Sequence, residues 1–382
     1  MTAVDSPLIV LAAGGTGGHV FPAEALAAEL ERRGARIVLF TDRRGDAVGG
    51  SLGRLDIRRI RAGGLAGKSL AGRLQGTLEL GVGLLQARSL LRRLAPRAVV
   101  GFGGYPSVPT MLAASFAGFH TVVHEQNAVL GRANRLLAPR VERIAGAFPA
   151  FHRLPRAVAP KVVHTGMPVR PAFAAVRTRP YPEIGSEGPI RLLVLGGSQG
   201  AQVFGEVVPT AIGRLDEGLR RRFEISQQCR PENLDAAQAI YDRAGVAATL
   251  SRFFDDVPDR LAAAHLVIAR AGASTVAEIT AVGRPSILVP YPHAIDDHQA
   301  ANARAVAEGG AAWVMAQPTF TPETLAERLR TLLAAPSTLR EVAGRARDAG
   351  CPEAAIRLAD TTFELIGCNG AGGGADTGRR AA

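Results

Sequence analysis

The sequence predicts an α/β fold made of two similar Rossmann-like domains, whose parallel sheets face each other across a cleft. Short β-rich runs alternate with helical patterns along the chain, which is typical of parallel sheets covered by helices on both faces. Each half opens with the same succession of an apolar run, a glycine-rich turn and a helical pattern. A proline-rich stretch interrupts the alternation between residues 166 and 189, and we place the domain boundary there.

The length and composition fit this division. A chain of 382 residues, 47% of them hydrophobic, is long and apolar enough for two separate cores. We expect the first domain over residues 1–166 and the second over 167–345. A C-terminal helix over 346–366 is then available to pack back on the first domain, and the Gly- and Ala-rich tail over 367–382 is expected to be disordered.

Each half contains six β-rich runs that we predict as strands. Ligands of such sheets bind beyond the carboxyl ends of the strands, so the residues that follow the runs are the candidates for a site. In the first half the runs cover residues 9–11, 37–40, 98–100, 121–124, 143–145 and 162–164, with helical patterns at 22–33 and 85–94. In the second half they cover 190–195, 223–226, 248–250, 266–269, 287–289 and 311–314.

The net charge of +11 favours anionic partners: nucleic acid, phosphorylated substrates or an anionic membrane. A high-GC genome rich in Arg and Ala is an alternative source of part of this charge, and no basic-aromatic RNA-binding motif is found. No apolar run approaches the roughly 18 residues that span a bilayer, and no leader peptide is found. We therefore expect a protein that stays in the cytosol. Cys229, Cys351 and Cys368 are far apart and odd in number, which indicates free thiols.

The turn after the first run has the sequence GGTGGH over residues 14–19 and is a candidate anion site. Glycines let a ligand approach the backbone, and the following helix start offers unpaired N–H groups. Neither nucleotide fingerprint fits, because Val20 stands where the dinucleotide motif needs its third glycine and no P-loop lysine follows. An ordinary strand-to-helix turn is the alternative.

Two further strand ends in the first half carry glycine or polar residues. GFGGYPS over residues 101–107 is a second glycine turn, and HEQN over 124–127 places four polar residues in a row. Polar clusters at strand ends are unusual for pure packing. Turn and cap chemistry is the alternative for each of them taken singly.

The segment over residues 63–94 combines leucines with basic side chains. Its leucines fall on roughly one helical face, which predicts an amphipathic helix facing the core. The same pattern fits a basic, leucine-bearing surface that lies on a membrane. The leucines are Leu70, Leu74, Leu78 and Leu85, and the basic residues are Lys68, Arg73, Arg88, Arg92 and Arg93.

The second half carries the densest cluster of candidate residues. GGSQGA over residues 196–201 is its glycine turn, and RAGASTVAE over 270–278 follows the run that ends at Ala269. Thr275 and Glu278 match a capping box, in which each side chain bonds the other's backbone N–H. Alternatively, Glu278 accepts both hydroxyls of a ribose, as acidic residues do in dinucleotide folds.

An anion has two candidate partners in this cluster. Arg270 is either a guanidinium fork for a phosphate or a solvated side chain. The backbone amides of Gly272, Ser274 and Thr275 form a candidate cradle for a pyrophosphate. No metal site is predicted, because HAIDDH over residues 293–298 fits no ligand pattern and no Asp-x-Asp occurs in the chain.

Taken together, five of these stretches resemble the MurG family, the UDP-N-acetylglucosamine transferases of peptidoglycan synthesis. They occur in the order and at the spacing of that family, and the match runs from Leu8 to Leu365. The stretches cover residues 14–19, 101–109, 124–127, 196–201 and 270–278.

The resemblance implies a GT-B type fold that works without a metal or cofactor. It implies UDP-N-acetylglucosamine as the donor, held mainly by the second domain. The implied acceptor is lipid I, undecaprenyl-pyrophosphoryl-MurNAc-pentapeptide, at the cytoplasmic face of an anionic membrane to which the protein binds peripherally. The C4 hydroxyl of the acceptor displaces UDP with inversion and gives lipid II. A cell-wall role suggests other cell-wall synthesis and division proteins as partners, and no nucleic acid.

The resemblance also implies roles for individual residues. His19, Tyr105 and Glu125 lie around the reaction centre, and Glu278 on the ribose. The acceptor side carries Gly14, Gly15, Gly103, Gly104 and Tyr105. Donor contacts fall on Thr16, Gly17, Gly18, Asn127, Arg170, Ser198, Phe254, Arg270, Ala273, Ser274, Thr275, Val276, Ala277, Glu278 and Gln299.

Three positions depart from the pattern of the family. Phe254 stands where an aliphatic residue usually lies near the uracil, and Met167 where many relatives have Asn. His298 and Gln299 replace the paired glutamines of some relatives, which leaves open the side chain that contacts the sugar.

A direct displacement needs a base for the proton of the acceptor hydroxyl. We expect His19 in this role, because a helix N-terminus disfavours the imidazolium and keeps the ring neutral near pH 7. Hydrogen bonding in the first helical turn is the alternative role for His19, and Glu125 is the alternative base. The turn over residues 14–19 then faces the pyrophosphate of the acceptor rather than the nucleotide.

Three other functions stay open at this point. The nearest is another UDP-sugar transferase of the same fold. A nucleotide-linked oxidoreductase is the second, since Asp42 follows the second run roughly where a dinucleotide fold places its ribose acid. The third is a basic protein that binds nucleic acid.

Overall fold

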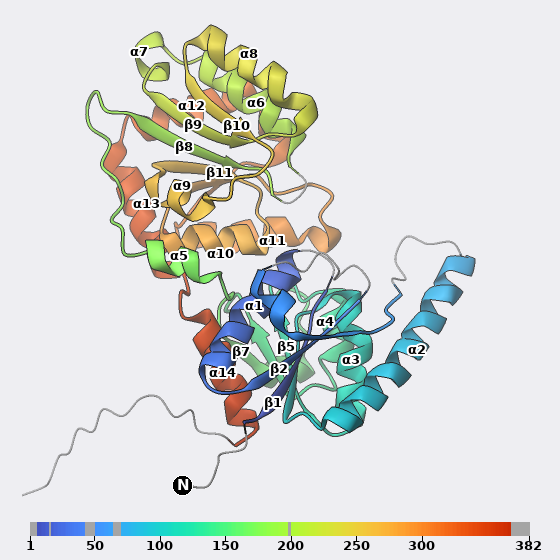
Figure 1. The fold of residues 1–382 in the computed structure, drawn as a ribbon. Coiled ribbons are helices and arrows are strands. Elements are labelled where there is room, and N and C mark those ends of the chain that lie inside the picture. The colour runs from blue at the N-terminus through green and yellow to red at the C-terminus, as the bar shows by residue number, and fades with distance from the viewer. Residues whose placement is uncertain (1–5, 15–16, 43–49, 64–69, 198–199, 368–382) are drawn as a thin grey trace, which may run out of the picture.

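Two parallel sheets, each covered by helices on both faces, form the molecule (Figure 1). The computed structural model describes residues 6–14, 17–42, 50–63, 70–197 and 200–367. The strand order is β3-β2-β1-β4-β5-β6-β7 in the first sheet and β10-β9-β8-β11-β12-β13 in the second. All named strand pairs are parallel, so the predicted fold class is confirmed.

The elements alternate along the chain as predicted. The first sheet contains β1 (Leu8–Ala12), β2 (Arg36–Thr41), β3 (Asp56–Arg59), β4 (Ala98–Gly101), β5 (His120–Glu125), β6 (Arg143–Gly146) and β7 (Val162–His164). The second contains β8 (Ile190–Leu195), β9 (Phe223–Gln228), β10 (Ala247–Ser251), β11 (Leu266–Ala269), β12 (Ser286–Leu288) and β13 (Trp313–Val314). The helices are α1 (Gly17–Arg32), α2 (Leu70–Leu94), α3 (Gly104–Phe116), α4 (Arg132–Leu137), α5 (Pro171–Val176), α6 (Gln202–Gly213), α7 (Glu217–Arg220), α8 (Leu234–Ala244), α9 (Val257–Ala263), α10 (Ala273–Val282), α11 (His298–Glu308), α12 (Pro322–Leu333), α13 (Pro336–Ala349) and α14 (Ala354–Leu365).

Three elements differ from the sequence prediction. β3 is absent from the prediction because it is an exposed edge strand with charged side chains in place of an apolar run. α1 begins at Gly17 instead of residue 22, so the end of the glycine turn is itself the first helical turn. α2 begins at Leu70, inside the amphipathic segment predicted over residues 63–94, and so extends well before the helical pattern at residues 85–94.

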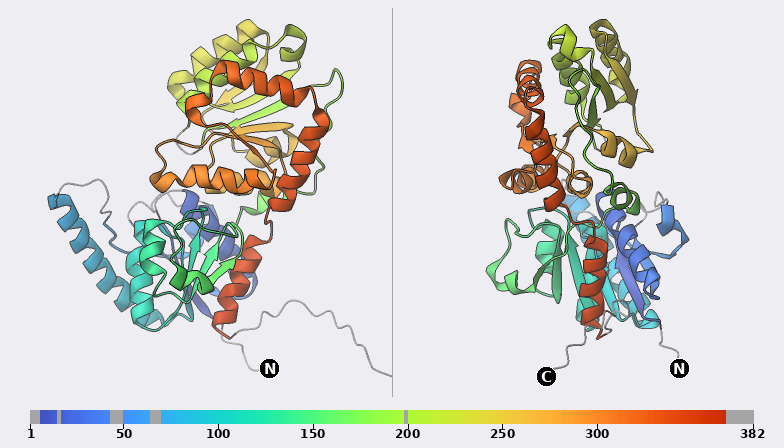
Figure 2. Two further views of the ribbon diagram at one scale, coloured as in Figure 1. Left: turned by 180° about the vertical axis from the view of Figure 1, so that it is seen from behind. Right: turned by 90° about the vertical axis from the view of Figure 1, so that its left-hand side faces the viewer.

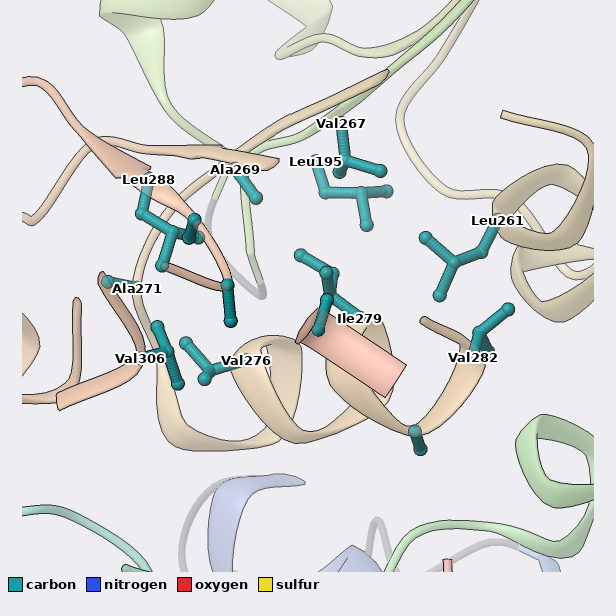
Figure 3. Packing of buried hydrophobic residues seen from close by; sticks show 14 of the residues in the cluster. Leu195, Leu261, Val267, Ala269, Ala271, Val276, Ile279, Val282, Leu288 and Val306 are labelled. Carbon is teal, nitrogen blue, oxygen red and sulfur yellow. The ribbon is translucent and has the colours of Figure 1, made fainter. Parts of the chain in front are cut away.

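Each sheet lies between two apolar layers. Successive residues of a strand point to opposite faces, so Ile9 and Val10 of β1 belong to different clusters. The second sheet repeats this arrangement. Figure 3 shows one of its layers, in which Ile279 of α10 lies beneath Leu195 and Val267 of the sheet. This layer fixes α10 against the strands that precede the candidate residues of the second domain.

The two domains are joined by more than the linker between them. α14 crosses back to the first domain (Figure 2), where Leu358 and Phe363 pack in the cluster that contains Leu26 of α1. The apolar layer beside α10 also takes in Ala128 and Phe148 of the first domain. The division after residues 166 and 345 stays our proposal, and the tail beyond residue 367 lies outside the described residues.

Candidate functional site

Residues that follow the strands of both sheets meet where the two domains touch. α10 and α11 of the second domain lie over the first domain in Figures 1 and 2. The first domain contributes residues after β1, β4 and β5, and the second contributes residues after β11 and β12. Of the predicted site residues, Gly15, Thr16 and Ser198 lie outside the described part of the chain.

His19 lies in the first turn of α1 and contacts the loop after β5. Its Nδ1 is 3.2 Å from Oε1 of Gln126. The pKa of His19 is lowered, as predicted, but burial is the main cause rather than the helix end. The nearby carboxylate of Glu125 and the carbonyl of Phe102 act in the opposite direction. Because burial prevails, the imidazole is mostly neutral near pH 7.

Glu125 is buried, and its carboxylate accepts hydrogen bonds from the loop between β5 and α4 and from α4 itself. It accepts hydrogen bonds from the backbone N–H groups of Asn127 at 3.0 Å and Gly131 at 2.8 Å. The side-chain amides of Asn127 and Asn134 donate to it at 3.3 and 2.9 Å. A carboxylate with four donors organises its own loop, which gives Glu125 a structural role and weakens the case for it as the base.

Asn302 of α11 joins the same loop to the second domain. Its Oδ1 accepts from the N–H of Ala128 at 2.8 Å. Its Nδ2 donates to Oδ1 of Asn127 and to the carbonyl of Ala271, each at 3.1 Å. The side chain is fully buried, so these bonds are shielded from water. Sequence reasoning missed Asn302, because an Asn inside a helical pattern carries no motif.

A second contact between the domains centres on Asp296, just before α11. Arg132, Arg135 and Arg153 of the first domain pair with its carboxylate at 3.1, 2.8 and 3.0 Å. These arginines lower the pKa of Asp296, with the hydrogen bond from Arg132 as the main cause. Asp296 and Asp297 both have φ of 55°, a strained conformation for residues other than glycine. Asp296 of the HAIDDH stretch therefore joins the two domains.

Glu278 lies inside α10 and does not cap it. The helix begins at Ala273 with Gly272 as its N-cap, and no side chain caps it, so the predicted capping box with Thr275 is wrong. The carboxylate of Glu278 lies 3.5 Å from Nη2 of Arg170. Burial raises the pKa of Glu278 to about 7, although the charge of Arg170 acts to lower it.

The surroundings of Glu278 contain polar atoms that the protein leaves unpaired. Nε of Arg170 and Oγ of Ser274 are buried and have no hydrogen-bond partner among the described residues. The guanidinium of Arg170 lies 4.9 Å from the ring centre of Phe21 in α1, so it links the second domain to the helix that carries His19.

Arg270 is buried inside the second domain, so the prediction of a solvated side chain is wrong. Its Nη1 donates to the carbonyls of Val289 at 3.1 Å and Pro290 at 3.3 Å. Its Nη2 donates to Oε1 of Gln317 at 2.7 Å. Because both terminal nitrogens bond the protein, this arrangement lends no support to a phosphate fork, which stays a prediction.

The other predicted residues lie in the turns and helices that border the interface. Gln299 Oε1 accepts from the N–H of Tyr291 at 3.0 Å. His298 faces the first domain closely enough to lower the pKa of His19. The ring of Phe254 is stacked by Arg260. Gly14 follows β1, Gly17 and Gly18 begin α1, Gly103, Gly104 and Tyr105 begin α3, and Ala273, Thr275, Val276 and Ala277 belong to α10.

Known proteins resemble this chain over both domains. Residues 9–146 match the glycosyltransferase family 28 N-terminal domain, and residues 191–358 match the C-terminal domain of that family. A protein of Paramagnetospirillum magneticum is 59% identical over 95% of this chain and 98% of its own length. It is named UDP-N-acetylglucosamine–N-acetylmuramyl-(pentapeptide) pyrophosphoryl-undecaprenol N-acetylglucosamine transferase.

Two further comparisons agree. A protein of the same name from Rhodospirillum rubrum is 58% identical over 94% of this chain and 92% of its own length. A crystal structure described as Acinetobacter baumannii MurG is 31% identical, with a TM-score of 0.75, and the match covers 94% of this chain and 99% of that one. The similarity therefore includes both sheets and the interface between them.

Proposed function

The chain belongs to the family of UDP-N-acetylglucosamine–N-acetylmuramyl-(pentapeptide) pyrophosphoryl-undecaprenol N-acetylglucosamine transferases, and from this premise we propose its reaction. It moves N-acetylglucosamine from UDP-N-acetylglucosamine to the C4 hydroxyl of the MurNAc of lipid I and forms lipid II for peptidoglycan synthesis. The observation that carries this proposal is the 59% identity to a named relative over 95% of the chain. The oxidoreductase and nucleic-acid alternatives have no comparable support.

An assay with labelled UDP-N-acetylglucosamine tests this reaction. The full-length protein is given a lipid I analogue, a lipid-free muramoyl acceptor, or a glycolipid without the muramoyl sugar. We expect label in the lipid I product, with release of UDP in equal amount. Transfer only to the other glycolipid would instead indicate a different UDP-sugar transferase of the same fold.

We place the donor at the start of α10. The first turn of this helix presents backbone N–H groups to the pyrophosphate. The carboxylate of Glu278 accepts the hydrogen bonds of the ribose hydroxyls. Ser274 lies in the first turn of the same helix, and its unpaired hydroxyl is available to bond the donor. The unpaired polar atoms beside Glu278 support this placement, because a ligand that bonds them removes the cost of burying them.

We propose His19 as the base of the reaction. Its Nε2 takes the proton of the acceptor C4 hydroxyl while that oxygen attacks C1 of the donor sugar on the face opposite to UDP. The bond from C1 to the diphosphate oxygen breaks, and UDP leaves with the electron pair. The imidazolium of His19 then loses its proton to water. The lowered pKa supports this role, because a protonated ring has no lone pair to offer.

We also propose that α2 binds the surface of an anionic membrane at the cytoplasmic face, where lipid I is embedded. Leu78, Val82 and Leu85 lie one helical turn apart on one face and are 64%, 39% and 68% exposed. Ala87 and Leu91 on the opposite face are fully buried against the domain. The prediction that the leucine face turns toward the core is therefore wrong for Leu78 and Leu85, because Ala87 and Leu91 of the other face pack against the domain instead. The side chains of Leu70 and Leu74 lie outside the described part of the chain. The exposed leucines support the membrane proposal. Among the described helices, none is long and apolar enough to cross a bilayer.

Exposed basic residues accompany this apolar face. Arg88, Arg92 and Arg93 are exposed along the second half of α2. Lys68 lies outside the described residues.

Flotation of the protein with anionic liposomes tests the proposal that α2 binds a membrane. We expect Leu78→Gln combined with Leu85→Gln to abolish binding, and Arg88→Glu with Arg92→Glu to weaken it strongly. Binding that none of these variants changes would contradict a membrane role of α2.

A further inference from the structure

Gln126 is a buried side chain whose contacts fix the orientation of its amide. Its Nε2 lies 2.8 Å from the carbonyl of Phe102 and 3.1 Å from the carbonyl of His124. A carbonyl oxygen only accepts hydrogen bonds, so the amide nitrogen, and not the amide oxygen, must occupy this position. The reversed amide would place an oxygen against two oxygens. The neighbours therefore determine which end of the amide faces His19.

The amide oxygen of Gln126 faces His19. Its Oε1 lies 3.2 Å from Nδ1 of that ring. Because an amide oxygen has no proton to give, Nδ1 must carry the proton of the contact. A neutral imidazole has one N–H group, so Nε2 is left with its lone pair.

His124 holds the other side of the amide in place. Its Nε2 donates to the carbonyl of Gly166 at 2.9 Å. Burial lowers the pKa of His124 to about 4, so the ring is neutral and its Nδ1 is an acceptor. That Nδ1 lies 3.3 Å from Nε2 of Gln126. The amide nitrogen of Gln126 has two protons, which it shares among the carbonyls of Phe102 and His124 and Nδ1 of His124. All three are acceptors, so they hold the nitrogen end of the amide on their side and leave the oxygen end facing His19.

We propose that Gln126 is a positioning residue that holds the proton of His19 on Nδ1 and thereby keeps Nε2 free to act as the base. This inference rests on the function proposed above. Gly104 completes the arrangement, because a Cβ at this position would lie 3.4 Å from Nε2 of His19. Glycine keeps a side chain out of the space next to the lone pair, where the acceptor hydroxyl is expected.

The tautomer of His19 is measured directly by ¹⁵N NMR of the intact protein with labelled histidines. The chain has 8 histidines, and His19→Ala identifies the signals of His19. We expect a protonated Nδ1 and an unprotonated Nε2 in the wild type. Gln126→Met removes the acceptor at similar volume, so Nε2–H should become populated. A wild-type ring with its proton on Nε2 would overturn the proposal, whatever the activity of any variant.

Kinetics with the lipid I analogue provide the second arm. Gln126→Met should lower kcat roughly ten- to hundredfold, because the wrong tautomer has no base to offer. KM for UDP-N-acetylglucosamine should stay within about twofold of the wild type. In a His19→Ala background the same change should have almost no further effect on kcat. An equal loss in both backgrounds would show that Gln126 acts only through the fold.

Gln227 supplies a matched control in the second domain. It is also buried, donates to the carbonyl of Phe204 and accepts from the hydroxyl of Tyr241. Gln227→Met therefore measures the effect of the same change at a buried glutamine far from His19. We expect a comparable loss of stability without loss of kcat per folded molecule. If the wild type fails to use lipid I, the proposed function fails, and the NMR result still decides the tautomer.

The pH profile gives a third readout. Glu125 raises the pKa of His19, His298 lowers it, and His124 stays neutral. The hydrogen bond to Gln126 also raises it, so its loss should move the acidic limb of kcat/KM to lower pH. A profile that falls in height but does not move would indicate a purely structural effect of Gln126→Met.

Discussion

The loop after β5 and the start of α10 differ in how far the protein itself satisfies their polar groups. In the first region Glu125 has four donors, and Gln126 bonds two carbonyls and His19. In the second region Ser274 Oγ has no partner among the described residues, and Glu278 has one long contact to Arg170. Buried polar groups cost free energy unless they are paired.

We infer from this difference that the first region positions the base and that the second region binds the donor. The first region contacts His19 of α1, the proposed base, before any substrate binds, which suits a base that must meet a hydroxyl in one orientation. In the proposed donor site, we expect UDP-N-acetylglucosamine to complete the second region, since it brings the hydroxyls and phosphates that the polar atoms there lack. Changes in the first region should therefore act on kcat, and changes in the second on donor affinity.

The largest effect is expected for His19→Ala. Loss of a general base costs about 10²–10⁴-fold in rate, so kcat should fall by that factor while UDP binding stays near normal. Glu125→Gln keeps the size of the side chain and some of its acceptor capacity, so its kcat should fall less. Steady-state kinetics with the lipid I analogue measure both. A normal kcat in His19→Ala, together with a large loss of kcat in Glu125→Gln, would contradict this assignment and identify Glu125 as the base.

The next effect is expected for Glu278→Gln. A hydrogen bond to a charged group contributes about 1.5–3 kcal/mol, so Kd for UDP-N-acetylglucosamine should rise by roughly ten- to hundredfold. The value of kcat at saturation should change little. Isothermal titration calorimetry measures Kd, with Glu206→Gln on the exposed face of α6 as the control. Unchanged donor affinity would remove Glu278 from the donor site.

A smaller effect is expected from pH. The pKa of Glu278 is raised to about 7 in the free protein, and ribose hydroxyls donate to the ionised form. Donor binding should therefore weaken as pH falls below 7, by at most about tenfold per pH unit for one proton. UDP-N-acetylglucosamine is the suitable ligand, because its diphosphate diester does not titrate in this range. Glu278→Gln should remove this dependence, and a dependence that persists would assign it to another group.

The smallest effect on activity is expected for Asn302→Ala. This change removes the three hydrogen bonds that join Asn127, Ala128 and Ala271. An unpaired buried group costs about 1–3 kcal/mol, so the free energy of unfolding should fall by that amount. Chemical denaturation measures it, and kcat should fall less than tenfold. A loss of kcat as large as that of His19→Ala would mean that the loop depends on the second domain for its arrangement.

Most strands and glycine turns could be predicted from the sequence because they follow from local patterns. Apolar runs and glycine turns repeat in both halves, and those signals lie within a few residues of each other. β3 carries no such signal, since an exposed edge strand needs no apolar run. The start of α10 was also not predicted. The capping-box interpretation requires Thr275 to precede the helix, whereas the helix begins at Ala273 and contains Thr275.

The site was predictable in composition but not in its contacts. The HEQN stretch is visibly polar in the sequence, yet nothing in it indicates that Gln126 turns its amide nitrogen to Phe102 and its oxygen to His19. Those partners lie 24 and 107 positions away in the chain. Asn302 and the arginines around Asp296 depend in the same way on how the two domains pack.

Hydrogen exchange of the intact protein, with and without UDP, tests the contrast between the two regions most directly. We predict that the amides of residues 125–131 are protected in the free protein and change little when UDP binds. The amides of residues 272–278 should gain protection when UDP binds, because their N–H groups and side chains acquire partners. Weak protection at 125–131 in the free protein, or a gain on UDP binding that is confined to that loop, would contradict the account.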